Sequence, residues 1–289
     1  MKIGALEAGG TKMVLGVFDE EGRLLEKTRF PTRTPEKTLP PMIDFFRQCG
    51  VDKLGIGTFG PVDLRRESPD YGTITATPKL DWRNTPLLRM MREALDIPVN
   101  IDTDVNAAAM AECRMGAAKG CQNAVYVTVG TGIGAGVVIN GQTVHGLMHP
   151  EVGHMLLRPH PQDPLPQGVC PYHESCLEGL ASGPSLSKRA GRSGEELPDD
   201  DPVFTLEAYY LAQMCVNLIM TVSPEKIILG GGVMQRSQLP DRIRKETVRL
   251  LGGYIQAPAI TARIDSYIIL PELYPISGLI GAFLLGRDA

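Results

Sequence analysis

The chain has 289 residues, which is long enough for two domains that each bury a hydrophobic core. It is 43% hydrophobic and 21% charged, with a net charge of −4, as is typical of a soluble globular protein without a basic surface for nucleic acid or an anionic membrane. No apolar run approaches the ~20 residues of a transmembrane helix, and the first residues do not resemble a signal peptide. Four scattered cysteines are typical of free thiols in a reducing cytoplasm, where we expect the protein to be located; they are Cys49, Cys113, Cys121 and Cys215.

The first thirty residues predict a three-stranded meander. Strands are expected over residues 2–6, 13–18 and 24–30, and the first bend is Glu7-Ala8-Gly9-Gly10-Thr11-Lys12. The paired glycines let backbone N–H groups approach an anion, while Thr11 and Lys12 offer a hydroxyl and an ammonium group to phosphate. Taken alone, a plain hairpin turn explains this bend better, because the spacing is not that of a P-loop.

Residues 34–115 are expected to alternate helices and strands. A helix within residues 34–50 is expected to be broken at Pro40-Pro41, and a second should run to Leu95 from an N-cap at Thr85 and a first residue at Pro86. Between them, a strand over residues 54–58 leads into a turn that begins at Gly60-Pro61 and exposes backbone. A strand over residues 99–102 then opens an alanine-rich helix that ends near Met115.

Two acids lie where the strand over residues 99–102 meets the alanine-rich helix. Catalytic groups of α/β proteins are placed at such strand ends. Asp102 and Asp104 are two residues apart and would share a face of an extended segment, so either could act as a general base. We favour Asp104, which is nearer the loop tip, and expect Asp102 to be structural or to cap the helix.

The pattern of the first thirty residues recurs from residue 124. A strand over residues 124–129 is followed by a glycine loop from Gly130 to Gly136, a strand over residues 137–139 and the type I′ turn sequence Asn140-Gly141. This repetition predicts a duplicated protein with a ligand between its halves. Two unrelated glycine turns are the alternative, but the glycine density favours phosphate binding.

Metal-ligand residues gather between Pro150 and Gly179. Cys170, His173 and Cys176 have the spacing of a metal clamp, and His154 is the natural fourth ligand. Two thiolates and two imidazoles predict a closed, structural Zn²⁺ site. A Pro-rich loop with incidental ligands is the alternative. Three further histidines leave the fourth ligand open: His145, His149 and His160.

The last third of the chain is expected to be mostly helical. Ser182-Gly183-Pro184 begins a helix, a long buried helix covers residues 206–222, and the last helices cover residues 239–251 and 277–286. A strand over residues 225–229 ends in Gly230-Gly231-Gly232. Three glycines let a flat ring or a phosphate lie against the backbone, whereas a simple turn needs only one.

Together these motifs resemble the ROK family (repressors, open reading frames and sugar kinases), and the resemblance covers essentially the whole chain. Residues 7–12 resemble its first phosphate motif, residues 130–136 its second, and residues 229–233 its adenosine motif. Thr103-Asp104-Val105-Asn106 resembles the catalytic segment N-D-x-N. Glu151-Val152-Gly153-His154, with Glu178, resembles the sugar- and zinc-binding stretch.

The resemblance implies an α/β, actin-like ATPase (ribonuclease H-like) fold, duplicated around a central cleft. The small domain would be residues 1–115 and the large domain residues 116–289, with the last helix packing back on the small domain. ATP, Mg²⁺ and structural Zn²⁺ are the implied cofactors, and Asp104 is the implied general base of in-line phosphoryl transfer. A homodimer is expected, with no nucleic acid or membrane partner.

The resemblance also implies the ligand-binding residues. The expected sugar ligands are Gly60, Pro61, Thr103, Asp104, Glu151, His154 and Glu178. The expected nucleotide ligands are Gly9, Gly10, Thr11, Lys12, Thr131, Gly132, Gly230, Gly231 and Gly232. His154 could bind zinc through one ring nitrogen and sugar through the other.

Three departures from the family pattern resemble its fructokinase branch: Glu7 for Asp, Thr103 for Asn, and CPYHESC for CxCGxxGC. Because the short Thr103 hydroxyl would leave a glucose hydroxyl unpaired, we expect fructose to be the best substrate, with transfer to O6. If Thr103 only caps the helix, the other residues decide specificity. A kinase of mannose, glucose or N-acetylmannosamine is the alternative. A sugar-sensing repressor is disfavoured because the first phosphate loop begins seven residues from the start, and an ATPase acting on proteins would not need the zinc clamp.

Overall fold

The structure, a computed structural model, describes all 289 residues, which form two compact units. The first unit contains Met1–Arg114, Gln142–Pro150 and Leu273–Ala289, and the second contains Met115–Gly141 and Glu151–Glu272. The division proposed from the sequence placed residues 142–150 in the large domain. In the structure this segment belongs to the first unit, and so does the last helix, which was expected to pack on the small domain.

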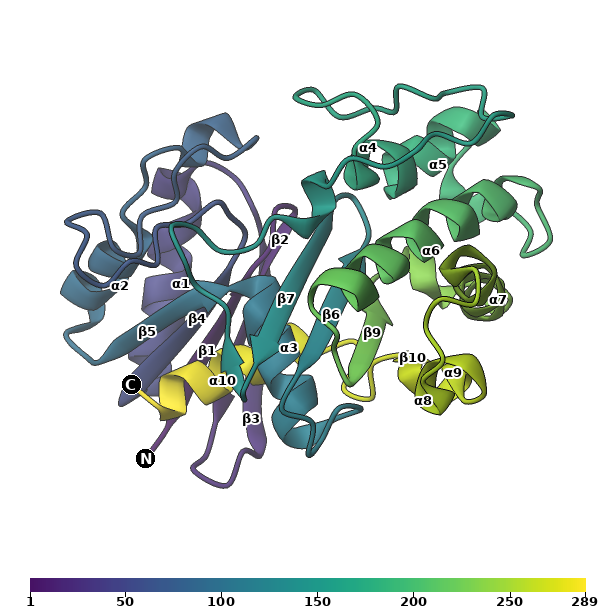
Figure 1. Cartoon of the computed structure of the whole chain (residues 1–289). Helices are drawn as coiled ribbons and strands as arrows, with labels where there is room; N and C mark the ends of the chain where they lie inside the picture. The colour runs from purple at the N-terminus through teal and green to yellow at the C-terminus, as the bar shows by residue number, and fades with distance from the viewer. The chain divides into compact units, whose positions relative to one another are not determined.

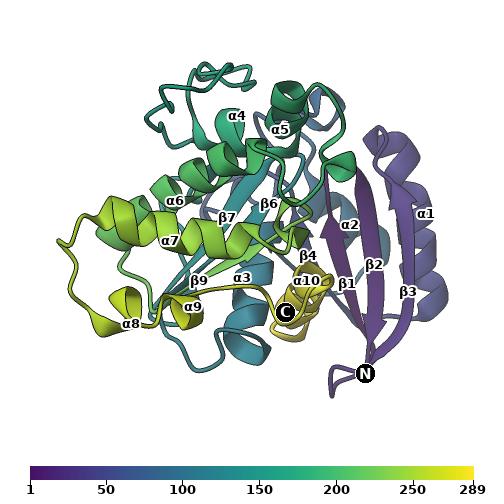
Figure 2. The same cartoon turned by 90° about the vertical axis from the view of Figure 1, so that its right-hand side faces the viewer.

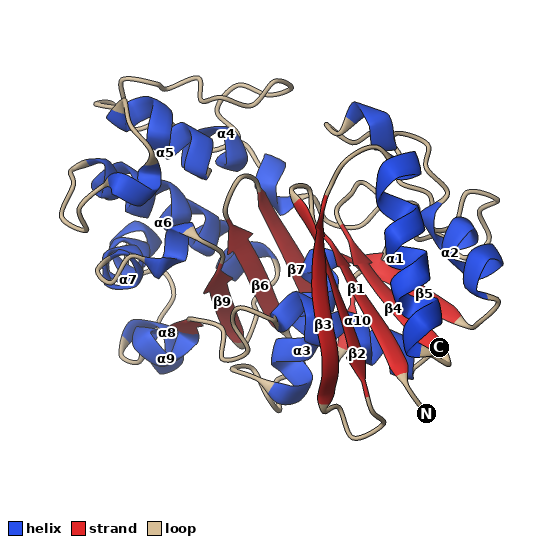
Figure 3. Cartoon of the chain, turned by 180° about the vertical axis from the view of Figure 1, so that it is seen from behind, coloured by secondary structure: helices blue, strands red, loops and turns tan.

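Two five-stranded mixed sheets form the framework (Figures 1 and 3). The first has the order β3-β2-β1-β4-β5, with β1 Ile3–Ala8, β2 Lys12–Phe18, β3 Leu24–Pro31, β4 Lys53–Thr58 and β5 Val99–Thr103. The second has the order β10-β9-β6-β7-β8, with β6 Ala124–Val129, β7 Ile133–Ile139, β8 Gln142–Thr143, β9 Lys226–Gly230 and β10 Ile268–Ile269. In each, the first strand pairs antiparallel with the second and parallel with the fourth, so the expected duplication is confirmed.

The helices belong to one unit or the other. The first unit has α1 Pro35–Cys49, α2 Leu87–Leu95, α3 Asp104–Met115 and α10 Ser277–Arg287, with the short 3-10 helix η1 Leu80–Trp82. The second has α4 Leu177–Ala181, α5 Gly183–Ala190, α6 Val203–Thr221, α7 Leu239–Leu251, α8 Pro258–Thr261 and α9 Ile264–Tyr267, with η2 Val152–His154, η3 Gly194–Glu196 and η4 Val233–Gln235. The sequence analysis did not anticipate α4, α8, α9 or β10.

The first sheet is buried on both faces, since successive strand residues point in opposite directions. Leu6 and Leu15 pack in one core with residues of α1 and α2, whereas Ile3 and Ala5 pack in another with residues of α3 and α10. Figure 3 shows the sheet between these two pairs of helices. The α10 helix approaches the sheet closely, because a Cβ atom on Gly55 would lie 1.9 Å from the carbonyl oxygen of Ala282.

Helix α1 is continuous, and the expectation that Pro40-Pro41 breaks it is wrong. Two prolines remove two backbone N–H donors, which leaves the carbonyls of Glu36 and Lys37 without their helical partners. Both of these residues are exposed, so water can solvate the carbonyls. The opposite face is held in the core by Leu39, Met42 and Phe46.

Two other local expectations have different outcomes. The α2 helix begins at Leu87, with Pro86 at the N-cap and no side-chain cap, so the expected cap at Thr85 is wrong. Asn140 and Gly141 both have positive φ angles, of 51° and 73°, as the expected type I′ turn requires.

Helix α6 has the length and mean hydropathy, 1.3 over its most apolar window, of a membrane-spanning helix. The sequence analysis expected no such segment. Of that window, 61% is buried inside the protein, and α6 lies beside α7 in Figure 2. The core helix of a soluble protein passes the same test, so α6 is only a weak indication of a membrane span.

Candidate functional site

The first glycine turn joins β1 to β2. The backbone N–H of Gly9 donates to the carbonyl of Lys12 at 3.0 Å, and a Cβ atom on Gly9 would lie 2.8 Å from that same oxygen. Thr11 and Lys12 are exposed at the tip of the turn. Glycine is therefore required by the hairpin itself, and the tip still offers polar groups to a ligand.

Glu7 enters this turn at the end of β1. Its carboxylate lies against the first turn of α10, where a Cβ atom on Gly278 would be 2.7 Å from Oε1. Burial raises the pKa of Glu7, although the ammonium groups of Lys12 and Lys27 oppose the shift. A half-buried carboxylate beside a phosphate-type turn is suited to receive a cation.

The second glycine turn is shorter than expected, because residues 133–136 belong to β7. Glu178 supports it: Oε2 of Glu178 accepts a hydrogen bond from the Ile133 N–H at 2.9 Å. A Cβ atom on Gly132 would lie 2.7 Å from the same oxygen. Glu178, expected only as a sugar ligand, thus also anchors the turn of Thr131 and Gly132.

The three glycines at the end of β9 have different roles. A Cβ atom on Gly230 would lie 2.6 Å from the hydroxyl of Tyr126, and one on Gly231 would lie 2.3 Å from the carbonyl oxygen of Val129. Gly231 also has a φ of +94°, which favours glycine. Gly232 has no atom within 4 Å of its Cβ position. Packing therefore explains the first two glycines, and only Gly232 leaves open space for a ligand.

The carboxylate of Asp102 is fully engaged within the protein. It accepts hydrogen bonds from the Thr103 N–H and Asn106 Nδ2, both at 2.7 Å, and from the Thr143 hydroxyl at 3.1 Å. Nε2 of His145 lies 3.0 Å from Oδ2 and 3.1 Å from Oδ1 of Asp102, and this pairing raises the pKa of His145. Asp102 is only 4% exposed, so it is structural.

Asp104 is the remaining acid at this strand end. It is the first residue of α3, is half-buried, and accepts a hydrogen bond from the Val105 N–H at 2.9 Å. A carboxylate at a helix N-terminus is stabilised in its ionised form by the helix dipole. This position favours Asp104 over Asp102 as the general base.

Thr103 caps helix α3. Its hydroxyl oxygen accepts a hydrogen bond from the Asn106 N–H at 3.0 Å, and the residue is 2% exposed. The sequence analysis expected this hydroxyl to influence sugar specificity, with a helix cap as the alternative, and the structure shows the cap.

The turn containing Gly60 and Pro61 is held by a buried histidine. Nε2 of His149 accepts a hydrogen bond from the Val62 N–H at 3.2 Å, and a Cβ atom on Gly60 would lie 3.1 Å from the same ring. Burial lowers the pKa of His149, which favours the neutral ring that can accept this bond. The carbonyl of Pro61 is occupied by the N–H of Thr75 at 2.8 Å.

The four expected metal ligands lie together in the second unit. The ligand atoms of His154, Cys170, His173 and Cys176 are all within 4.8 Å of one another. Nδ1 of His154 is 3.9 Å and 3.8 Å from the two cysteine sulfurs, and Nδ1 of His173 is 3.7 Å from Cys170 Sγ. A tetrahedral zinc site would have S···N edges of about 3.5 Å, so the arrangement fits such an ion.

Comparison with known proteins agrees with this geometry. The sequence model of the ROK family matches residues 3–289. The chain belongs to the ROK family.

Individual ROK proteins resemble the chain over nearly their whole length. The putative fructokinase of Bacillus subtilis (strain 168) is 44% identical over 99% of this chain and 96% of its own. The fructokinase of Pediococcus pentosaceus is 43% identical over 100% of this chain and 99% of its own. A ROK family glucokinase from Streptomyces griseus, solved with glucose and AMPPNP, is 28% identical and covers 100% of both chains with a TM-score of 0.81. The expected actin-like ATPase fold is thereby confirmed.

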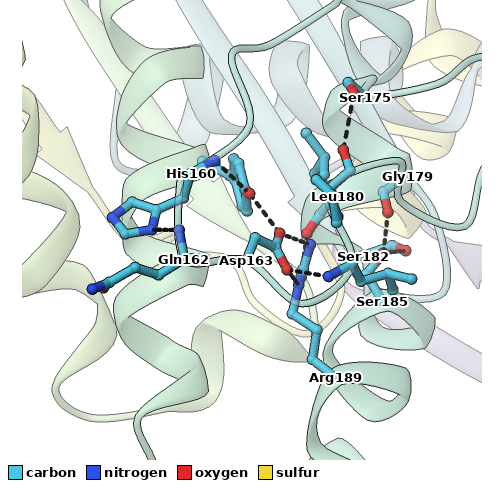
Figure 4. Close-up of polar contacts among 12 residues, drawn as sticks. His160, Gln162, Asp163, Ser175, Gly179, Leu180, Ser182, Ser185 and Arg189 are labelled. Carbon is cyan, nitrogen blue, oxygen red and sulfur yellow. Dashed lines mark hydrogen bonds and ion pairs between the residues drawn. The ribbon is translucent and has the colours of Figure 1, made fainter.

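In this ROK chain, a buried ion pair anchors the base of the loop that carries the candidate metal ligands (Figure 4). Asp163 accepts hydrogen bonds from Nε and Nη2 of Arg189, both at 2.9 Å, and from the Tyr210 hydroxyl. Burial would raise the pKa of Asp163, but these donors lower it overall. Arg189 also donates to the carbonyl of Leu180 in α4. The loop is thus tied to three helices, α4, α5 and α6, by contacts that its sequence spacing does not reveal.

Glu151 has an unusual acidity for a carboxylate. Although it retains solvent exposure, surrounding protein atoms and then the carboxylate of Glu178 raise its pKa to about 7. In the unfolded chain the proton would leave near the ordinary value of 4.5. The folded state therefore binds the extra proton between these values, and the contribution of Glu151 to stability falls as the pH rises from about 4.5 to about 7.

This acidity predicts a pH dependence of sugar binding. If ionised Glu151 accepts a bond from a sugar hydroxyl, sugar affinity should rise with pH and have its midpoint near 7. Glu178→Gln removes the repulsion but keeps an oxygen for Ile133, so the midpoint should move to lower pH. Titration of sugar into both proteins across this range measures the shift. An unchanged midpoint in the variant would show that Glu178 does not influence Glu151.

Proposed function

We propose that this ROK protein is an ATP-dependent fructokinase that transfers a phosphoryl group to O6 of fructose. The observation that carries the proposal is the position of Asp104 at the start of α3, beside an Asp102 whose oxygens are already engaged. The named fructokinases at 43–44% identity support the sugar, and the AMPPNP complex supports the nucleotide.

The residues of this chain would act in the following way. Asp104 accepts the proton of the attacking hydroxyl, and such a general base contributes roughly 10²–10⁴-fold to the rate. The N–H groups of the two glycine turns that are not bonded within the turns would hold the phosphates of ATP, with Thr11 and Lys12 at the tip of the first turn. Mg²⁺, when bound with the nucleotide, would neutralise phosphate charge, and Glu7 would be the carboxylate that orients it.

The sugar would be held from the second unit by Glu151, His154 and Glu178. Nδ1 of His154 faces the cysteine sulfurs, which leaves Nε2 available for a sugar hydroxyl. Because Nδ1 would be bound to the metal, the proton of the neutral ring would be on Nε2. Structural zinc at His154, Cys170, His173 and Cys176 would thus position a sugar ligand without taking part in the chemistry.

Zinc binding is tested by removing one thiolate. The wild-type protein should contain about one zinc per chain, as a closed four-ligand site implies. Cys176→Ser should lose the metal, loosen the start of α4, where Cys176 Sγ accepts from the Gly179 N–H, and raise the sugar KM. Metal analysis and sugar kinetics measure these effects, with Cys215→Ser, a buried cysteine outside the cluster, as the control. A wild-type protein without zinc would contradict the assignment.

Substrate choice is tested by a coupled assay of fructose, mannose, glucose and N-acetylmannosamine with Mg-ATP. We expect kcat/KM to be highest for fructose. A higher value for another hexose would replace fructose in the proposal but leave the assignment as a sugar kinase. No turnover of any sugar would overturn that assignment.

The same assay tests the role of Thr103. Asparagine is also a good N-cap, so Thr103→Asn should fold normally. Because the Thr103 hydroxyl is buried in a cap, we expect the fructose-to-glucose ratio of kcat/KM to stay unchanged. A shift toward glucose would restore Thr103 as a specificity residue.

The homodimer and the cytoplasmic location also belong to this proposal. Light scattering of the purified protein measures the first, and fractionation of cells that produce it measures the second.

A further inference from the structure

A basic hollow lies beside the first glycine turn, within the first unit. It encloses about 430 Å³ between two segments, one leading from β3 into α1 and the other containing η1. Its lining includes Thr32, Arg33, Lys37, Lys79, Asp81 and Trp82. A hollow of this size suits a small molecule rather than a protein segment.

The charges around the hollow are unbalanced. Arg33, Lys37 and Lys79 contribute three cations, and Asp81 is the single carboxylate of the lining. The side chains of these three cations make no hydrogen bond or ion pair within the protein, although Lys37 interacts electrostatically with its neighbour Glu36. Like charges gathered in one hollow repel each other and attract an anion. The 15-residue helix α1, which begins beside Thr34, adds the positive end of its dipole.

The walls of the hollow are fixed to the first glycine turn. The Thr32 hydroxyl donates to the carbonyl of Gly9 at 2.7 Å, and the Thr32 N–H donates to the carbonyl of Thr11 at 3.0 Å. Cε of Lys79 lies 3.3 Å from the Cβ position of Gly10. The cations and the first glycine turn therefore form one continuous surface.

Buried contacts hold the outer part of the same surface in place. Nε1 of Trp82, which is 1% exposed, donates to the carbonyl of Arg33 at 2.6 Å. This bond joins η1 to the segment before α1, so Arg33 and Lys79 are presented by two anchored backbones rather than by mobile loops.

We propose that this hollow binds the phosphate group of a phosphorylated small molecule. An arginine and two lysines can together balance a phosphate dianion, which one surface lysine cannot. The phosphate could come from the polyphosphate tail of the nucleotide or from a phosphorylated sugar. The choice of these two phosphate sources rests on the proposed function. The existence of the anion site does not depend on it.

Binding of inorganic pyrophosphate to the full-length protein tests the site without sugar or nucleotide. Isothermal titration should show binding in the wild type and a Kd weakened by about 10-fold or more in Lys37→Ala and in Lys79→Ala, since each removes a charged hydrogen-bond donor. Lys119→Ala, at an exposed lysine of the second unit, is the matched control and should bind as the wild type does. No binding by the wild type, or equal binding by all four proteins, would overturn the proposal.

Competition then identifies the source of the phosphate. Displacement of pyrophosphate by AMPPNP assigns the hollow to the nucleotide tail, and displacement by fructose 6-phosphate alone assigns it to a phosphorylated sugar. Displacement by neither would contradict a phosphate site for this reaction. If the protein phosphorylates sugars but does not bind pyrophosphate, only the phosphate site in the hollow is refuted. If it binds pyrophosphate but phosphorylates no sugar, only the assignment as a kinase is refuted.

Discussion

Asp104→Asn is expected to lower kcat by roughly 10²–10⁴-fold, the usual contribution of a general base. Asparagine has nearly the same shape and can still accept the hydrogen bond from the Val105 N–H, so the start of α3 should be preserved. The amide cannot take a proton from the attacking hydroxyl. Sugar affinity and thermal stability should therefore remain close to those of the wild type, and steady-state kinetics with Mg-ATP measure the loss.

A control separates this effect from the loss of one charge. Asp241→Asn removes a carboxylate from the first turn of α7, where it pairs with Arg244 on the surface, and should leave kcat unchanged. Asp102→Asn should differ from both variants, because it replaces a buried carboxylate that pairs with His145. If Asp104→Asn retained wild-type kcat, the base would have to be sought elsewhere or phosphoryl transfer would depend on positioning alone.

Gly231→Ala is expected to lower the free energy of unfolding by about 3 kcal/mol or more, from the combined cost of a strained backbone and overpacking. The φ of +94° is unfavourable for alanine, and the new Cβ would lie 2.3 Å from the carbonyl oxygen of Val129 in the neighbouring strand β6. That oxygen belongs to backbone within a sheet and cannot easily move away. Urea unfolding of both proteins measures the difference.

The neighbouring glycine gives the contrast. Gly232→Ala adds a methyl group where no atom lies within 4 Å, so its stability should stay within about 1 kcal/mol of the wild type. If the nucleotide lies against Gly232, the KM for ATP should rise while the KM for sugar does not. Equal loss of stability in both variants would mean that the two glycines have the same structural role.

Much of the fold could be predicted because it depends on local patterns. Apolar segments bounded by glycine predicted β6 and β9 within one residue, and Asn140-Gly141 predicted the type I′ turn. Local rules failed at Pro40-Pro41, where burial of the opposite helix face outweighs two missing hydrogen bonds. They also failed for short elements such as α8 and α9, whose four residues contain too little periodicity to be recognised.

The sequence by itself determined which chemical groups this ROK chain possesses and their order along it. The close spacing of Cys170, His173 and Cys176 was sufficient to place three ligands together, because a short loop limits how far they can separate. The acid pair at the start of α3 was also evident, since both acids follow one strand directly.

Only the tertiary structure decided how these groups divide their tasks. Asp102 is structural because Thr143 and His145, about forty residues away, supply donors to its carboxylate. Likewise, Glu178 supports the second glycine turn through Ile133, forty-five residues before it. A hydrogen bond depends on distance in space, and sequence spacing carries no information about partners that the fold brings together from different strands and loops.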